Sequence, residues 1–389
     1  MWLSGHADGP PRACPAPLAA CAQGAWLALA ALSPEHCDPR FDAYRLLGER
    51  AAIAGLGRRG RVSAGGACRL LDTADGMLAL NLARDDDREL LPAWLELPTA
   101  DIGGLAEALR ARRTASLLRR ARTLGLAAAA VVPPRRRASW FRATRRGAAR
   151  RGARAAPLVI DLSSLWAGPL CAQLLAHCGA RVVKVESSAR PDGARRGPAR
   201  FYDLLNAGKE SVALDVRQPA DRVRLRALLA RADIVIESAR PRALEQMGIH
   251  ASELLAGRPG MVWLGITGYG RRAPMRDWIA YGDDAGVAAG LAWLMGNEGE
   301  DPVFCADAIA DPLTGLHAAV LGLAAWFDGG GQLLDVALHD VAACCAGAGA
   351  VTAAGAARAA DVALPFARAA TARAAGLGAD TARVLRELG

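Results

Sequence analysis

From Pro157 onward, the chain alternates short apolar runs with segments of helical character. The runs are PLVIDLSS, RVVKVES, SVALDVR, DIVIES and GMVWLGITGYG, and the segments between them include LWAGPLCAQLLAHCGA and PADRVRLRALLARA. Strands that are apolar throughout must be covered on both faces, as in a parallel sheet with helical crossovers. We therefore predict an α/β fold for residues 157–345, with a doubly wound, Rossmann-like parallel sheet.

The first turn of this unit limits the choice of nucleotide. After PLVIDLSS the turn carries only Ala167-Gly168-Pro169. A dinucleotide-binding fold needs Gly-x-Gly-x-x-Gly there, because the backbone must approach the pyrophosphate closely. NAD and FAD are therefore poor candidates.

Residues 45–133 have a different pattern and predict a second, smaller α+β domain. ACRLLDTADGMLALNLA is typical of two strands joined at the Asp75-Gly76 turn. An amphipathic helical pair then ends at Gly125, and LAAAAVVPP follows as a buried strand. Residues 1–44 contain one apolar helical segment, APLAACAQGAWLALAAL, whose role the pattern does not indicate.

The net charge of +9 has a local origin. Residues 134–156 contain nine arginines and no acidic residue, and the rest of the chain is nearly neutral. Such a segment, with Trp140 and Phe141 inside it, could contact nucleic acid or anionic lipid. Because the charge is not spread over a folded face, we expect a solvated linker between the domains, and nucleic-acid binding is the weaker interpretation.

Cysteine usage and hydropathy bear on the compartment. Nine cysteines are scattered along the chain without a Cys-x-x-Cys pair, which predicts reduced thiols and no metal site. No run of 18 or more apolar residues is present, and the N-terminus lacks the basic start and apolar core of a signal peptide. We expect a cytoplasmic protein without a membrane-spanning helix.

Two aspartates stand out in FCADAIADPLTGLHAAVLGLAAW, which is otherwise almost entirely apolar. Asp307 and Asp311 precede a run with the composition of a buried helix. An acid at a helix N-terminus stays ionised and nucleophilic, but capping the helix is an equally frequent role. On local grounds, the two readings of Asp311 are even.

The chain resembles the class III CoA-transferases, also called the CaiB/BaiF family. The blocks that carry the resemblance include VIDLSSLWAGPLCAQLLAHCGARVVKVE (159–186), ADIVIESARPRALEQMGI (232–249) and ADPLTGLHAAVLGLAAW (310–326). The resemblance implies an enzyme that moves CoA between an acyl-CoA thioester and a free carboxylic acid. Coenzyme A is then a substrate and not a permanently bound cofactor, and the chain is expected to form a homodimer.

The resemblance also implies a catalytic residue. The family's nucleophile lies in an Asp-x-x-x-Gly pattern, which DPLTG matches, so Asp311 would form a covalent aspartyl intermediate with the acyl group and then with CoA. Asp307 has no counterpart in the pattern, and we interpret it as a loop residue or a partner of the site. The resemblance assigns the substrate channel to Leu165, Trp166, Ala167, Tyr281 and Gly315.

Binding of CoA requires cations for its phosphates. By resemblance, the CoA-binding residues are Lys209, Leu214, Arg240 and Arg196. The chain departs from the family near the adenine, where an arginine, an asparagine and a phenylalanine are replaced by Ser187, Ser238 and Ala239. Arg190 and Arg242 are candidates to compensate for these replacements.

Two alternatives to transfer stay open. The racemases of this family pair a histidine with the aspartate, but the chain has Tyr281 there, and His177 and His317 are better interpreted as packed or surface residues. The other alternative is a CoA-binding protein that has lost turnover.

The order of the segments differs from the family. The family's small domain follows the segment that resembles GGGQLLDVALHDV, whereas here residues 64–133 resemble that domain and stand first. Residues 346–389 form an Ala-rich connection and a C-terminal helix, GADTARVLRELG. We interpret this order as a permuted or fused arrangement.

Overall fold

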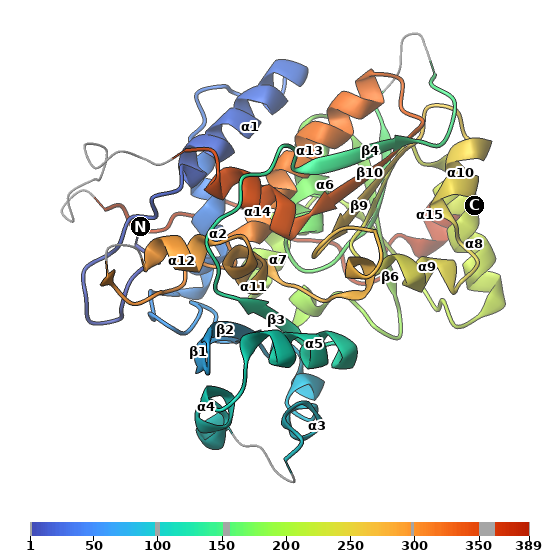
Figure 1. Ribbon diagram of the computed structural model, residues 1–389. Coiled ribbons are helices and arrows are strands. Elements are labelled where there is room, and N and C mark those ends of the chain that lie inside the picture. The colour runs from blue at the N-terminus through green and yellow to red at the C-terminus, as the bar shows by residue number, and fades with distance from the viewer. Residues whose placement is uncertain (1, 98–101, 151–155, 297–298, 350–361, 389) are drawn as a thin grey trace.

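The computed structural model describes residues 2–97, 102–150, 156–296, 299–349 and 362–388 (Figure 1). The strands of its larger unit are β4 (Phe141–Arg145), β5 (Leu158–Leu162), β6 (Arg181–Ser187), β7 (Glu210–Leu214), β8 (Ile234–Glu237), β9 (Val262–Thr267) and β10 (Gln332–Ala337). In the described part of the chain, these seven strands form one sheet in the order β4-β10-β9-β8-β5-β6-β7.

The order of the parallel strands defines the fold class. Among the parallel strands, the chain forms β5 first and then moves outward to β6 and β7. It returns to the other side of β5 for β8, β9 and β10. This is the order of a doubly wound sheet, with its switch point between β5 and β8. The predicted α/β fold is confirmed.

Helices cover both faces of this sheet (Figure 1). On one face lie α1 (Leu18–Leu32), α6 (Ala167–His177), α13 (Ala310–Phe327) and α14 (Leu338–Ala346); on the other lie α8 (Pro219–Arg231), α10 (Ala251–Gly257) and α15 (Thr381–Leu388). Val159 and Ile234 belong to the first core, while their neighbours Ile160 and Val235 belong to the second. This alternation explains why the strands are apolar on both sides.

Shorter elements connect these layers. They are α2 (Glu49–Ala54), α7 (Ala199–Asn206), α9 (Pro241–Glu245), α11 (Gly282–Ala288), α12 (Leu291–Met295) and the 3-10 turns Ala43–Gly48, Gly193–Arg196 and Met275–Asp277. Residues 1–44 are part of the large unit, because α1 packs against α13 and buries Trp26 and Leu29 in the first core.

The small unit is a three-stranded antiparallel sheet with helices on one face. Its elements are β1 (Cys68–Thr73), β2 (Gly76–Asn81), β3 (Ala127–Ala130), α3 (Leu91–Leu95), α4 (Ile102–Arg110), α5 (Thr114–Leu124) and the 3-10 turn Asp85–Asp87. Thr73 pairs with Gly76, so the hairpin turns where the sequence predicts it. Leu78 packs toward the helices, while Leu70 packs on Val287 and Phe304 of the large unit.

The arginine-rich segment is not only a linker, and this corrects the prediction. Phe141–Arg145 forms β4, which pairs antiparallel with β10 at the edge of the large sheet. An open edge offers unpaired backbone groups to any extended segment, and charged side chains are well tolerated there. Trp140 packs on Phe141 and on the half-buried His317, so both rings have partners within the large unit. Residues 151–155 lie outside the described part.

The C-terminal helix α15 also belongs to the large unit. Asp380 accepts a hydrogen bond from the backbone N–H of Ser211 at 2.9 Å, and Val384 lies in the second core. Most of the Ala-rich connection, residues 350–361, lies outside the described part. Among the helices that the structure describes, none has the length and apolar character needed to cross a membrane.

The crossing of α13 over α6 gives a stability prediction. A Cβ on Gly315 would lie 2.6 Å from the carbonyl oxygen of Ala167, whereas a Cβ on Gly322 of the same helix would meet only Leu264 at 3.6 Å. We expect Gly315→Ala to lower the free energy of unfolding by about 1–3 kcal/mol. Gly322→Ala should be neutral or stabilising, by up to about 1 kcal/mol. Urea unfolding measures both, and equal effects would contradict the packing argument.

Candidate active site

Asp311 lies where two helices begin. It is the second residue of α13, and its Oδ2 accepts a hydrogen bond from the backbone N–H of Gly282, the first residue of α11, at 3.0 Å. The side chain is half-buried. A Cβ on Gly282 would lie 2.3 Å from both Asp311 Oδ2 and the carbonyl oxygen of Ala308. Only glycine therefore allows this approach of backbone and carboxylate.

Asp307 is the anchor of a buried ion pair. Its side chain is fully buried, and Arg50 of α2 donates from Nε to Oδ2 at 2.8 Å and from Nη2 to Oδ1. The residues on either side, Ala306 and Ala308, have positive φ angles of 57° and 43°. Non-glycine residues in this conformation cost of order 1–3 kcal/mol each and concentrate at functional sites.

Two further aspartates surround Asp311. Asp283 accepts a hydrogen bond from the N–H of Ala308 at 2.9 Å and another from the side chain of Ser63. Asp284 accepts hydrogen bonds from Asn81 Nδ2 and from the N–H of Tyr281, both at 2.9 Å. Burial raises the pKa of Asp283 to about 6 and that of Asp284 to about 7.

The electrostatics of Asp311 follow from this environment. Burial is the largest cause that raises its pKa, Asp283 and Asp307 act in the same direction, Arg50 and the N–H of Gly282 oppose them, and the result is a pKa of about 7. At neutral pH the residue is divided between the acid and the carboxylate. The same guanidinium also interacts with Asp283, so one cation serves three carboxylates.

The small unit supplies partners to this cluster. Ser63, just before β1, contacts the buried Asp283, and Asn81 of β2 donates to the buried Asp284, whereas Arg50 comes from α2 of the large unit. The backbone of Gly65 also packs close to the Arg50 side chain, since a Cβ on Gly65 would lie 3.2 Å from Arg50 Nη2. The cluster is therefore assembled from both units of the same chain.

The predicted channel loop lies beside the cluster. Leu165 is exposed and has a φ of 71°, while Trp166 is buried and has the Arg50 guanidinium 5.2 Å from its ring centroid. Ala167 begins α6, and its carbonyl oxygen faces Gly315. The structure thus brings Leu165, Trp166 and Ala167 to the site. Gly315 packs between helices and does not line open space.

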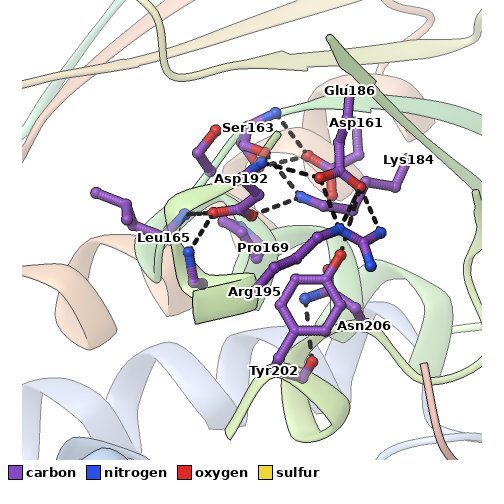
Figure 2. A network of polar contacts seen from close by, with 12 residues as sticks. Asp161, Ser163, Leu165, Pro169, Lys184, Glu186, Asp192, Arg195, Tyr202 and Asn206 are labelled. Carbon is purple, nitrogen blue, oxygen red and sulfur yellow. Dashed lines mark hydrogen bonds and ion pairs between the residues drawn. The ribbon is translucent and has the colours of Figure 1, made fainter. Parts of the chain in front are cut away.

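A buried charge network holds this loop in place (Figure 2). Lys184 Nζ donates to the carbonyl oxygen of Ser163 at 2.8 Å and pairs with Asp192 at 3.0 Å. Asp192 in turn accepts a hydrogen bond from the N–H of Leu165 at 2.9 Å. The unusual φ of Leu165 is therefore supported by a carboxylate whose own charge is neutralised by Lys184.

Lys209 belongs to the same network, which corrects its predicted role. Its ammonium is buried and donates to Asp161 at 2.9 Å, to the carbonyl oxygen of Pro169 at 3.0 Å and to Asn206 at 3.1 Å. An ammonium has three donors, so none is left for a phosphate of CoA. Burial, opposed by Asp161, lowers the pKa of Lys209 to about 8.

Two other predicted CoA ligands, Leu214 and Arg196, lie in the core and on the surface. Leu214 is buried in the second core at the end of β7, and its carbonyl oxygen accepts from the N–H of Ser188. Arg196 is exposed, whereas its neighbour Arg195 pairs with Glu186 at 2.6 Å (Figure 2). The structure does not bring Lys209, Leu214 and Arg196 together around one cavity.

Arg240 does lie at the switch point of the sheet. A pocket of about 200 Å³ opens there, lined in part by Ser163, Ser187, Arg190 and Ala239. Burial, followed by the neighbouring Arg242, Arg84 and Arg190, lowers the pKa of the Arg240 guanidinium. Within the described residues, no carboxylate lies within salt-bridge distance of Arg240 or Arg190.

Tyr281 stands between this cationic group and the aspartates. It precedes α11, and its pKa is raised by burial, with Arg84 and Arg190 acting in the opposite direction. The phenol is thus neutral at pH 7. In the part of the chain that the structure describes, no group of three or more His, Cys, Asp or Glu residues is placed to hold a metal ion.

The comparison with known proteins decides the family. The model of a family described as CoA-transferase family III matches residues 157–373, more than half of the chain. The chain belongs to CoA-transferase family III. This confirms the resemblance drawn from the sequence blocks.

Relatives with assigned names cover the same part of the chain. Succinyl-CoA–D-citramalate CoA-transferase of Chloroflexus aurantiacus is 31% identical over 193 residues, 47% of this chain and 48% of the relative. Succinate–glutarate CoA-transferase of Agrobacterium fabrum is 32% identical over 200 residues, 47% of this chain and 50% of the relative. The chain spans about half the length of the curated relatives it matches.

A solved structure of a CaiB/BaiF family protein from Brucella suis is also similar. It is 31% identical, with a TM-score of 0.44 over 48% of this chain and 53% of that one.

The sequence analysis missed several residues of the candidate site. Arg50 gave no signal, because it lies 257 residues from its partner Asp307 and in an unremarkable segment, GERAAIA. Gly282, Asp283 and Asp284 follow Tyr281 directly in YGDDAG. A glycine followed by two acids in an apolar context was the signal available for them.

The position of Lys209 gives a second stability prediction. Lys209→Met leaves Asp161 buried without its ion-pair partner, so we expect the free energy of unfolding to fall by about 3–5 kcal/mol. Arg196→Met, at an exposed cation, should change it by less than about 0.5 kcal/mol. Urea unfolding measures both. A Lys209→Met protein of normal stability with weakened CoA binding would instead support a phosphate-binding role.

Proposed function

We propose that the chain transfers CoA between an acyl-CoA thioester and a free carboxylic acid through a covalent intermediate on Asp311. The observation that carries this proposal is the Asp311 carboxylate itself, half-buried at the start of α13 with the Gly282 N–H 3.0 Å from Oδ2. A carboxylate in this position has a free oxygen, Oδ1, for attack and a donor beside the other oxygen.

The reaction proceeds by exchange of acyl groups. Asp311 attacks the thioester carbonyl, the C–S bond breaks, and a mixed anhydride and CoA thiolate form. The thiolate then attacks the aspartyl carbonyl and releases the donor as a carboxylate, which leaves an aspartyl thioester. The acceptor carboxylate then attacks the aspartyl thioester, which gives a second mixed anhydride and CoA thiolate. The thiolate attacks the acceptor's carbonyl, so that a new acyl-CoA leaves and the Asp311 carboxylate is restored.

The Gly282 N–H has a defined role in this sequence. When Oδ1 carries the acyl group, Oδ2 becomes the carbonyl oxygen that gains negative charge as the thiolate attacks. The N–H that already lies 3.0 Å from Oδ2 stabilises this charge without reorganisation. Gly282 is the residue that makes this contact possible, because any Cβ would clash with Oδ2.

Binding of CoA is proposed at the switch point of the sheet. Ligands of open α/β sheets bind outside the carboxyl ends of the strands at this point, where the pocket lined by Ser187, Arg190 and Ala239 lies. The serine and alanine leave room where the family has larger side chains. Arg190 and Arg240 have no carboxylate partner among the described residues and supply cations for the phosphates.

The racemase alternative is less well supported. It requires a second acid/base group opposite Asp311, and Tyr281 occupies the family's histidine position. Burial raises the pKa of its phenol, so the phenolate needed for proton abstraction is scarce at neutral pH. His317 is bonded to the carbonyl oxygen of Leu313 and packed against Trp140.

Trapping of the intermediate tests the proposal. The protein is incubated with a panel of acyl-CoAs, quenched with hydroxylamine, digested and examined by mass spectrometry. We expect a hydroxamate at Asp311 that depends on acyl-CoA. Asp311→Asn should abolish it together with CoA transfer. Asp301→Asn, an exposed control in the preceding loop, should keep both. CoA binding without modification across the panel would favour the binding protein without turnover.

The pH dependence of acylation follows from the pKa of Asp311, which is raised to about 7. The carboxylate is the nucleophile, so the initial rate should rise with pH through this value and be about tenfold higher at pH 8 than at pH 6. Arg50→Met removes the opposing cation and should shift the profile to higher pH, whereas Arg50→Lys should shift it less. Stopped-flow release of CoA thiol measures these rates. An unshifted profile in Arg50→Met would exclude Arg50 from this role.

A further inference from the structure

Each cysteine of residues 1–44 lies beside a cysteine of the large unit. These segments lie far apart in the sequence, so the pairing is produced by the packing of the N-terminal segment on the first core. The pairs are Cys14 with Cys305, Cys21 with Cys345, and Cys37 with Cys178. All six thiols are free in this structure.

The pair Cys37–Cys178 combines a close approach of its two sulfur atoms with one partly exposed thiol. Its sulfur atoms are 3.6 Å apart, and the two residues are separated by 141 positions in the chain. Cys37 follows the turn after α1, and Cys178 ends α6 directly after His177. Cys37 is buried, with 1% of its surface exposed, whereas Cys178 is half-buried and His177 is exposed, so the side of the pair that faces solvent is that of Cys178 and His177.

The two turns that carry the pair fit against each other. Ser33 Oγ hydrogen bonds to His36 Nδ1 at 3.1 Å, and a Cβ on Gly179 would lie 3.2 Å from the His36 ring. Gly179 has a φ of 89°, which ends the turn after α6. The close approach of the sulfur atoms is therefore set by two packed turns and does not depend on one flexible side chain.

We propose that Cys37 and Cys178 form an oxidation site that closes to a reversible disulfide on reaction with a peroxide. The Cys37 thiolate attacks one peroxide oxygen, the O–O bond breaks, and a sulfenic acid and hydroxide form. The Cys178 thiol then attacks the Cys37 sulfur, loses its proton, and the S–O bond breaks with loss of water. In total, two thiols and one hydrogen peroxide give one disulfide and two waters.

The environment divides the roles of the two thiols. The hydrogen bond from Cys178 and then one from His177 lower the pKa of Cys37 to about 5, while the same contact and burial raise that of Cys178. The interaction with Cys37 also raises the pKa of His177, whose imidazolium can then supply a proton to the leaving hydroxide. Cys37 is the attacking thiolate and Cys178 the resolving thiol.

The disulfide would have a structural consequence. It would fasten the segment that leads to α2, and so to Arg50, onto the far end of α6, whose near end carries Ala167 beside Trp166. Closing a loop of this length restricts the unfolded chain and stabilises the folded one. The site does not depend on the proposed transfer reaction.

Peptide mapping tests the site in the full-length protein. The reduced protein is treated with hydrogen peroxide, free thiols are alkylated under denaturing conditions, and a non-reducing digest is examined by mass spectrometry. We expect a cross-linked Cys37–Cys178 peptide that dithiothreitol separates, together with a Tm several degrees above that of the reduced protein. Cys37→Ser and Cys178→Ser should lose both effects.

A matched control distinguishes the pair from general oxidation. Cys344 is half-buried like Cys178 but bonds to the carbonyl oxygen of Arg137, so Cys344→Ser should keep the cross-link. Because the wild-type cross-link is observed directly, the test does not depend on the stability of the variants. Terminal oxidation of Cys37 without a cross-link, or cross-links only between Cys14 and Cys305 or Cys21 and Cys345, would overturn the proposal.

Discussion

The ion pair between Arg50 of α2 and Asp307 fixes the loop before α13 at the point where the chemistry is proposed. Asp307 is fully buried, and without the guanidinium its charge would carry a large desolvation penalty. The pair therefore ties α2 to the loop that precedes α13, in which Ala306 and Ala308 have strained backbone conformations. The small unit contributes to the cluster through Ser63, which contacts Asp283, and Asn81, which donates to Asp284.

A second buried network fixes another loop of the candidate site, the turn between β5 and α6. Lys184 neutralises Asp192, which binds the N–H of Leu165, and Lys209 neutralises Asp161, which binds Ser163. These charges are worth little as net stability, because burying them costs about as much as their attraction returns. Their effect is positional. They hold the turn between β5 and α6 in one conformation, with Trp166 against Arg50.

The parts of this structure that could be predicted are those that depend on residues adjacent in the sequence. The apolar runs indicate the parallel sheet, and DPLTG singles out Asp311, because periodicity and motif are local properties. Arg50 could not be found, since its contact spans 257 positions. Lys209 was misassigned because sequence does not reveal that its three donors are already used. The edge strand β4 was missed because its pairing depends on the open edge of β10.

The charge of the cluster bears on why an aspartate is used for the proposed transfer. Burial is the main cause that disfavours the ionised form of Asp311; Asp283 and Asp307 add to it, and Arg50 opposes it. Acylation removes the charge of Asp311, so the burial penalty and the repulsion that raise its pKa are both relieved in the anhydride and in the thioester. A site of this composition accordingly destabilises the free nucleophile relative to the covalent intermediates. The same burial and repulsion lower the fraction of Asp311 that is ionised at neutral pH. The cluster therefore makes the Asp311 carboxylate more reactive but leaves less of it ionised.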